Sequence, residues 1–201
     1  MNELKVLSYD LRKHVVDMII AGKGGHIGGD MSVMEILVEL YMKQMNISPE
    51  NKDLDNRDRF VLSKGHSVES YYAVLAKKGF FPMEEVISTF SQFGSKFIGH
   101  PNNKLPGIEM NSGSLGHGLP VCVGMAMAGK MDRKDYRVYV VMGDGELAEG
   151  SVWEGAWQPA ITAWITCAPW WTGTGCRFPG VRRMSWATMT CMSVSEALDG
   201  M

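Results

Sequence analysis

Apolar positions along the chain switch between helical spacing and short continuous runs. Residues 3–21 repeat apolar side chains at helical intervals, which predicts an amphipathic helix. The segments DRFVLSKGH, ending at His66, and RVYVVMGDGE contain continuous apolar runs and are expected to be buried strands. Further helices are expected at residues 68–78, 83–92 and 121–131 and from about Glu149. Strands that alternate with helices predict an α/β fold with a parallel sheet covered on both faces.

Glycine and capping residues suggest where the second helix begins. The stretch GKGGHIGGD, residues 22–30, is expected to be a glycine-rich loop around His26. Ser32 followed by Glu35 fits a capping box, so a helix over residues 33–45 is expected to start there.

Composition and charge exclude several classes of protein. The chain has 201 residues, 45% of them hydrophobic, and a formal net charge of -2, which excludes simple disorder and gives no electrostatic case for binding nucleic acid or an anionic membrane. No apolar run approaches the roughly 20 residues of a membrane span. Charges interrupt the first apolar stretch, so it does not read as a secretory signal. We therefore expect a cytoplasmic protein.

The composition changes sharply after Ala156. Three of the four cysteines and five of the six tryptophans lie beyond this residue, and the last lysine of the chain is Lys134. We therefore expect two regions, residues 1–156 and residues 157–201, of which only the first has the pattern of an ordinary folded domain.

The first candidate site is GDGE, residues 143–146. A strand that runs into Gly-Asp-Gly places Asp144 at the carboxyl edge of a parallel sheet, where such folds bind ligands. A carboxylate there suits Mg²⁺, which few protein oxygens usually hold and phosphate oxygens complete. The alternative is that Asp144 only caps a strand-to-helix turn.

Two further features lie in predicted loops. The segment GSLGHG, residues 113–118, precedes a helix and is suited either to cradling a phosphate or to forming a tight turn. Four histidines lie beside glycines in predicted loops, and loops at one sheet edge can converge; each alone also fits a structural or surface role. These are His26, His66, His100 and His117. None of them has the spacing of a zinc site.

Taken in order, these segments resemble a known family. The strings GGHIGGDMS, DRFVLSKGHSVESYYAVL, GHP, PGIEMNSGSLGHGLPVCVGMAMAGK and RVYVVMGDGELAEGSVWEGA are similar to the N-terminal, diphosphate-binding part of transketolase. The similarity is greatest to the split bacterial and archaeal form, in which the two halves are separate chains. It implies the thiamine-diphosphate-binding fold, with a parallel sheet that is incomplete in this chain.

The resemblance implies roles for individual residues. Asp144 would hold Mg²⁺ or Ca²⁺ against the diphosphate of the cofactor, and His66 would contact that diphosphate. His26 and His100 would face the sugar hydroxyls and the reacting carbonyl. The remaining implied cofactor contacts are the glycine-rich loop, where His117 replaces the family's Gln, and the turn that keeps the metal loop in shape: Gly113, Leu115, Gly116, His117, Gly143, Gly145 and Glu146.

The resemblance also implies a reaction and a partner. Such a subunit would bind thiamine diphosphate and move a two-carbon ketol unit from a ketose phosphate to an aldose phosphate. A C-terminal transketolase subunit would complete a heterotetramer, and it would carry the glutamate that activates the cofactor.

The segment after Ala156 departs from the family pattern. The family has an Asn about 30 residues after GDG, at the end of a further strand, whereas Gly173 and Thr174 stand in this region here. We expect no strand there, and therefore little or no activity and poor stability for this chain. Back-translation with one base restored in the Ala156 codon permits a string containing LCAVVDRN, with Asn in the place of Thr174. We interpret residues 157–201 as the product of a one-base deletion; the alternative is a divergent segment whose tryptophans form a core.

Two other functional classes fit the same residues. One is a related thiamine-diphosphate enzyme, such as a 1-deoxyxylulose-5-phosphate synthase or an E1 component of a dehydrogenase. The other is a non-enzymatic fragment that binds only a partner, or nothing.

Overall fold

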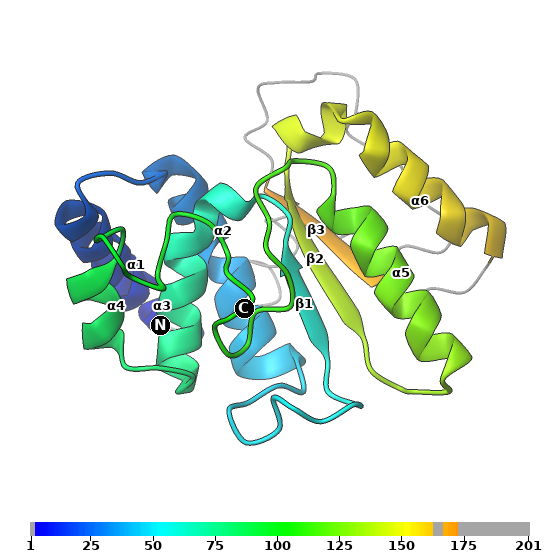
Figure 1. Ribbon diagram of the computed structural model, residues 1–201, viewed down its shortest axis with the longest axis horizontal. Coiled ribbons are helices and arrows are strands. Elements are labelled where there is room, and N and C mark those ends of the chain that lie inside the picture. The colour runs from blue at the N-terminus through cyan, green and yellow to red at the C-terminus, as the bar shows by residue number, and fades with distance from the viewer. Residues whose placement is uncertain (1–2, 163–166, 173–201) are drawn as a thin grey trace.

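The computed structural model describes residues 3–162 and 167–172, with the side chains described as far as Trp157. A three-stranded parallel sheet lies between two layers of helices (Figure 1). The strands are β1 (Arg59–Leu62), β2 (Val138–Gly143) and β3 (Cys167–Thr172), in the order β1-β2-β3. The predicted α/β class with a parallel sheet is confirmed.

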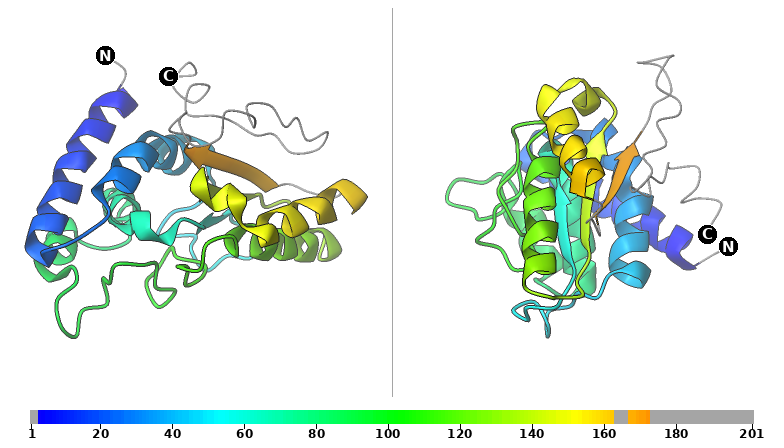
Figure 2. Two further views of the ribbon diagram at one scale, coloured as in Figure 1. Left: turned by 90° about the horizontal axis from the view of Figure 1, so that it is seen from above. Right: turned by 90° about the vertical axis from the view of Figure 1, so that its right-hand side faces the viewer.

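Helices cover both faces of the sheet, as the end-on view of Figure 2 shows. One layer contains α1 (Glu3–Gly22), α2 (Ile27–Glu39), α3 (Val68–Lys78) and α4 (Met83–Thr89). The other contains α5 (Gly118–Met131) and α6 (Gly150–Thr162). Three short helical turns complete the described elements. A π-helical turn at Leu40–Gln44 continues α2, a 3₁₀ turn at Gly65–Ser67 precedes α3, and a 3₁₀ turn at Gly145–Ala148 lies between β2 and α6.

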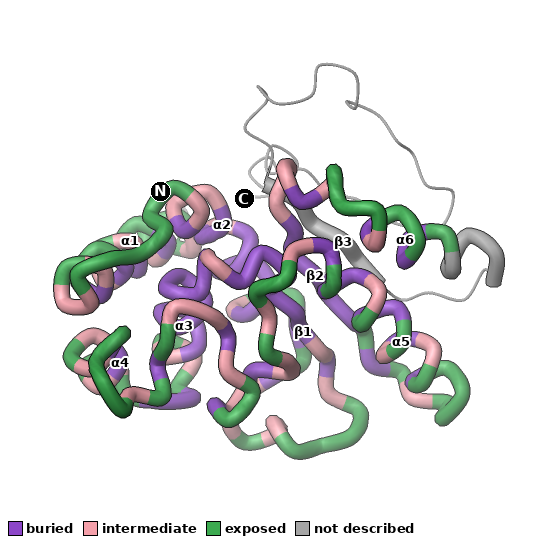
Figure 3. Tube along the Cα trace, turned by 45° about the horizontal axis from the view of Figure 1, so that its top comes forward, coloured by how far each residue is buried: buried purple, intermediate pink, exposed green. Residues whose placement is uncertain are grey.

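Alternation of side chains along the strands builds two separate cores. Phe60 and Leu62 of β1, with Tyr139 and Val141 of β2, pack among α1 to α4. The intervening strand residues pack with α5 and α6 on the opposite face; these are Val61, Val138, Val140 and Met142. Successive side chains of a strand point to opposite faces, and both faces are covered, which explains why residues 60–62 and 138–142 are continuous apolar runs. Figure 3 shows the buried strands between the two layers.

The second helix begins earlier than the sequence suggests. We expected a loop at residues 22–30 and a capped helix from residue 33, but α2 starts at Ile27. Ser32 lies inside α2, where its hydroxyl donates to the Gly29 carbonyl at 2.9 Å, and Glu35 pairs with Arg12 of α1. The capping-box prediction is therefore wrong, because both side chains have other partners. Similarly, α5 begins at Gly118 rather than residue 121, with Pro120 tolerated in its first turn.

The third strand corrects a further expectation. We expected no strand after Ala156, but β3 pairs with β2 in parallel from Val138↔Cys167 to Gly143↔Thr172. Tryptophan and threonine favour strands, and the exposed edge of β2 offers unpaired backbone groups to a following segment. Residues 157–162 of the predicted non-family region continue α6, whereas residues 163–166 and 173–201, including the position of Thr174, lie outside the described residues. None of the described helices has the length and apolar character needed to cross a membrane.

Candidate cofactor site

The carboxyl ends of β1 and β2 lie side by side, because Leu62 pairs with Val141. Ser63 to His66 follow β1, and Asp144 to Glu146 follow β2, which ends at Gly143. Parallel strands bring such segments to the same edge of a sheet, where α/β folds bind ligands. The predicted GDGE and SKGH segments therefore meet at one edge.

Glu146 connects the segments at this edge. Its side chain is only 2% exposed, and its Oε1 accepts hydrogen bonds from the Ser63 hydroxyl and from the Gly116 N–H at 2.7 Å. Its Oε2 accepts from the Gly143 N–H at 3.0 Å. The Ser63 hydroxyl oxygen in turn accepts from the Gly118 N–H at 3.1 Å. One carboxylate thus joins the ends of both strands to the glycine-rich loop.

The glycine-rich loop approaches this carboxylate closely. Gly116 has a φ of +83°, and a Cβ there would lie 2.5 Å from the Ser151 hydroxyl. A side chain at Gly118 would meet Ser63, with a Cβ only 2.4 Å from the Ser63 Cβ. Glycine is required at these positions because neighbouring segments occupy the space of a side chain.

The other predicted residues of this loop lie around its turn. A Cβ at Gly113 would be 3.1 Å from Cδ2 of His100, so the loop lies beside that imidazole. Leu115 is half-buried, and His117 is exposed with its Nδ1 3.3 Å from the Leu115 carbonyl oxygen. Gly145 begins the 3₁₀ turn after Asp144.

Three of the four predicted histidines form a cluster. The ring centroids of His26 and His66 are 5.4 Å apart, and those of His26 and His100 are 6.3 Å apart. The Tyr72 hydroxyl contacts the His100 carbonyl oxygen at 3.0 Å, which fixes the GHP segment to α3. In the described part of the chain, His117 makes no ring contact with this cluster.

Charge near the cluster affects His66. Burial lowers the pKa of His66, and the positive charges of Lys64, His26 and His100 lower it further. The neutral imidazole of His66 is therefore favoured near neutral pH, and a neutral imidazole can accept a proton or a hydrogen bond.

Lys64 is a site residue that the sequence analysis missed. It is 2% exposed, and its Nζ donates to the Gly29 carbonyl at 3.1 Å and to the Ser32 hydroxyl at 3.2 Å. Burial lowers the pKa of Lys64 to about 8, against the opposing effect of three acidic side chains, Asp30, Asp144 and Glu146. Its place directly after a buried strand, at the ligand-binding edge, was the available signal.

The arrangement fits a diphosphate held through a metal ion. Asp144 is half-buried at the sheet edge, and a Cβ at Gly143 would have no heavy atom closer than 3.9 Å. Among the described residues, no group of three or more His, Cys, Asp or Glu side chains is arranged to hold a metal. One carboxylate together with ligand phosphate oxygens is the way in which proteins often hold Mg²⁺.

A family model for "Transketolase, thiamine diphosphate binding domain" matches residues 5–161. The chain belongs to this family. An apulose-4-phosphate transketolase subunit of Phocaeicola vulgatus is 51% identical over 153 residues, covering 76% of this chain and 54% of the relative. The 6-deoxy-6-sulfo-D-fructose transketolase subunit SqwG of Clostridium sp. is 44% identical over 133 residues, covering 65% of this chain and 48% of that protein.

Solved structures agree with this assignment. The transketolase of Campylobacter jejuni superposes with a TM-score of 0.79 at 30% identity, covering 85% of this chain and 28% of that one. This transketolase-family chain spans about half the length of the curated relatives it matches first, 54% and 52%.

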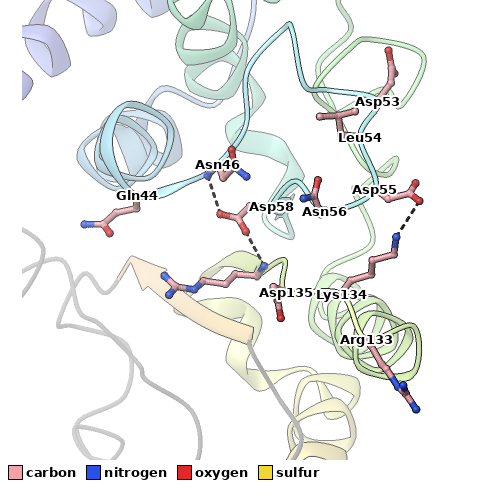
Figure 4. Close-up of a pocket in the computed structure, with 11 residues that line it drawn as sticks. Gln44, Asn46, Asp53, Leu54, Asp55, Asn56, Asp58, Arg133, Lys134 and Asp135 are labelled. Carbon is pink, nitrogen blue, oxygen red and sulfur yellow. Dashed lines mark hydrogen bonds and ion pairs between the residues drawn. The ribbon is translucent and has the colours of Figure 1, made fainter.

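A separate groove lies at the opposite end of the strands of this transketolase domain. Figure 4 shows its polar lining, which encloses about 950 Å³. Asp58 precedes β1 and accepts hydrogen bonds from the N–H groups of Asn46 at 2.9 Å and Arg137 at 2.7 Å. Lys134 pairs with Asp55 across the groove at 3.3 Å. The groove lies at the amino ends of β1 and β2, away from the histidine cluster.

Proposed function

We propose that this chain is the N-terminal part of a split, thiamine-diphosphate-dependent transketolase. The transferred group would be a two-carbon ketol unit, moved from a ketose phosphate to an aldose phosphate. The observation that carries the proposal is the junction at Glu146, which joins the GDGE turn, the SKGH segment and the GSLGHG loop at one sheet edge. Two relatives named as transketolase subunits support a partner chain.

Different residues at this edge would bind different parts of the cofactor. Asp144 would hold Mg²⁺ or Ca²⁺ against the diphosphate, and His66 would donate to or accept from the diphosphate oxygens. Leu115 and the glycines of its loop would line the thiazolium ring, with His117 at the start of α5. Glu146 holds the main chain of both segments in place.

The histidine cluster would bind the hydroxyl groups of the sugar and transfer protons. Thiamine diphosphate, when bound, supplies the nucleophilic carbon at which the carbon–carbon bond is broken and re-formed. His26 is exposed and His100 is half-buried, so both rings can reach a substrate that enters from solvent. Each would hold or move a proton at a ring nitrogen as the sugar hydroxyls and carbonyl change protonation.

A C-terminal transketolase subunit would complete the site in a heterotetramer. We further propose that the 201-residue chain has little or no activity, because Thr174 stands in place of the family's Asn, which would be a second metal ligand beside Asp144. Because β3 pairs with β2, we propose that the chain lacks the Asn ligand but does not lack a further strand.

Calorimetry with thiamine diphosphate and Mg²⁺ tests cofactor binding. We expect heat of binding for the full chain and its loss in Asp144→Asn. The exposed Glu154 of α6 provides a matched control, and Glu154→Gln is expected to bind as the unmodified chain does. Absence of heat both in the unmodified chain and in the chain with its frame restored after Ala156 would support a non-enzymatic fragment and refute the proposal.

A second assay tests the reaction. The chain with its frame restored after Ala156 would be combined with the C-terminal half of a split transketolase. Either a ketose phosphate or pyruvate would then be supplied as donor. Transfer from the ketose phosphate is the expected result. Turnover of pyruvate alone would instead identify a synthase or dehydrogenase of the same cofactor class.

A further inference from the structure

Two acidic side chains are buried together beneath the histidine cluster. Asp30 lies in the first turn of α2 and Glu69 in the first turn of α3, and both are 0% exposed. Asp30 Oδ2 and both Glu69 oxygens have no hydrogen-bond partner of good geometry. The buried hydroxyl of Ser67 likewise has no partner. Two unpaired charges at such a place are costly, so the pair requires a donor.

The pair lies where α2, α3 and the segment that carries His26 meet. Asp30 Oδ1 accepts from the Ser70 N–H at 2.8 Å, and the Ser70 hydroxyl donates to the Asp30 carbonyl at 3.0 Å. A Cβ at Gly25, the residue before His26, would lie 2.4 Å from Glu69 Oε1. The Glu69 carboxyl group therefore packs directly against the main chain next to His26.

A second close approach joins α2 to His66. A Cβ at Gly29 would lie 2.6 Å from the Ser67 hydroxyl and 3.3 Å from Cδ2 of His66. The first turn of α2 thus touches the turn that carries His66 on one side and approaches Glu69 on the other. Any separation of Asp30 from Glu69 would move both histidine-bearing segments.

Charged and titratable groups surround the pair. Burial raises the pKa of Asp30 to about 8, and the charge of Glu69 adds to this effect. Burial also raises the pKa of Glu69, against the lowering effect of its own main-chain N–H, of the Asp30 side chain, and of the main-chain N–H and charge of His26. Three other groups face this region: Lys64 and His66 from the segment before α3, and Tyr72 within α3. From α1, the apolar Ile19 packs beside Gly25.

We propose that Asp30 and Glu69 share a single proton and act as a positioning pair that holds His26 against His66. The proton resides on Asp30 and is donated to Glu69, so the buried pair carries one negative charge and the carboxyl groups attract each other. When the second proton is lost, two like charges repel and the first turns of α2 and α3 separate. The link to catalysis rests on the proposed function, whereas the shared proton and the positioning do not.

Infrared spectroscopy of the unmodified full chain tests the proton directly. At about pH 7, a pH below that at which Asp30 titrates, we expect the carbonyl band of a protonated carboxylic acid, shifted by ¹³C labelling of aspartate. The band is expected to disappear in Asp30→Asn and to persist in Glu39→Gln. Glu39 is a matched control because it is a buried carboxylate at the other end of α2 that accepts from Lys43 and Gln44. A spectrum of the unmodified chain without the band overturns the proposal.

The pH dependence of unfolding provides a second test. An acid whose pKa is raised on folding binds its proton more tightly in the folded chain, so stability falls as pH rises between about 4 and 8. The unfolding constant is then expected to rise by up to about tenfold per pH unit in this range. Asp30→Asn, whose amide donates to Glu69 at every pH, is expected to flatten this slope, and Glu39→Gln to retain it. Equal slopes in the unmodified chain and Asp30→Asn contradict the proposal.

Positioning is tested by the contact between the two rings. Nuclear Overhauser contacts between His26 and His66 are expected at about pH 7 and expected to weaken at about pH 9, above the pH at which Asp30 titrates. Asp30→Asn is expected to keep them at both pH values. Loss of these contacts at the same pH in both proteins would show that the pair does not position the histidines. None of these measurements uses the cofactor, so their outcomes are independent of the outcome of the transketolase assay.

Discussion

Replacing Glu146 by alanine removes one buried acceptor from three donors. The Ser63 hydroxyl and the N–H groups of Gly116 and Gly143 all bond to its carboxylate. Leaving a buried donor unsatisfied destabilises a protein by about 1–3 kcal/mol. With three donors left unsatisfied, Glu146→Ala is expected to destabilise the chain by about 3–9 kcal/mol. That is a large share of the roughly 5–15 kcal/mol that stabilises an ordinary domain.

The amide variant separates hydrogen bonding from charge. Glu146→Gln keeps one acceptor oxygen but presents an NH₂ group to at least one of the three donors. We therefore expect an intermediate loss of about 1–3 kcal/mol. Urea unfolding measures both losses, and hydrogen exchange at the Gly116 and Gly143 amides locates them. Faster exchange at these two amides, with little change in the buried strand residues Val140 and Val141, is the expected pattern.

The result that refutes this reasoning is specific. If Glu146→Ala unfolds within about 1 kcal/mol of the unmodified chain, water replaces the carboxylate and the junction does not hold the site together. Glu154→Gln controls for removing an acidic side chain from the same part of the chain. Its carboxylate is exposed on α6, so no measurable change is expected.

Three further predictions concern other parts of the molecule. Burial lowers the pKa of His66, so this side chain makes a contribution to stability that is lost as pH falls below about 6.5, opposite in sign to the contribution of Asp30. His66→Gln is expected to remove the His66 contribution in pH-dependent urea unfolding. Gly29→Ala places a Cβ against the His66 ring, which is expected to shift the imidazole resonances in an NMR spectrum, whereas Gly24→Ala meets no atom within 4 Å and leaves them unchanged. Tyr71→Phe leaves the Gly107 carbonyl and the Tyr41 hydroxyl without their partner and is expected to lower stability by about 1–3 kcal/mol in thermal unfolding, an expectation refuted by an unchanged melting temperature.

The reading frame after Ala156 is tested by resequencing the gene. A missing base between codons 150 and 165 is the expected finding, and an intact frame would contradict the interpretation of residues 157–201 as an out-of-frame product.

The parts of the site that follow from topology were predictable from the sequence. A strand that ends in SKGH and another that ends in GDGE must open at the same edge when they are parallel, so the meeting of His66 with Asp144's segment follows from strand direction alone. The convergence of His26 and His100 on His66 was anticipated as one of two alternatives. The family resemblance then named the cofactor, which no spacing of residues supplied.

The missed features depend on packing that is not local in sequence. Gly28 and Gly29 resemble helix breakers, yet both lie inside α2. At Gly29 the turn that carries His66 leaves no room for a side chain, which accounts for a glycine at this helical position. Ser32 and Glu35 match a capping box in spacing, but Glu35 forms an ion pair with Arg12, which is more than twenty residues away in the sequence. The segment after Ala156 lacks a clear helix-then-strand pattern, yet β3 forms there at an edge of the described sheet, where the missing N–H of Pro169 is tolerated.

The short ladder between β1 and β2 is clamped by a carboxylate at each end. Only four residue pairs join the strands, from Arg59↔Val138 to Leu62↔Val141. Asp58 holds the main-chain N–H of Arg137 at the amino end, and Glu146 holds that of Gly143 at the carboxyl end. A slip of one residue would exchange the two hydrophobic cores and break both clamps at once. The register of β1 and β2 therefore determines the geometry of the cofactor edge. The groove of Figure 4 and the histidine cluster lie at opposite ends of this strand pair, so a change of register would alter both.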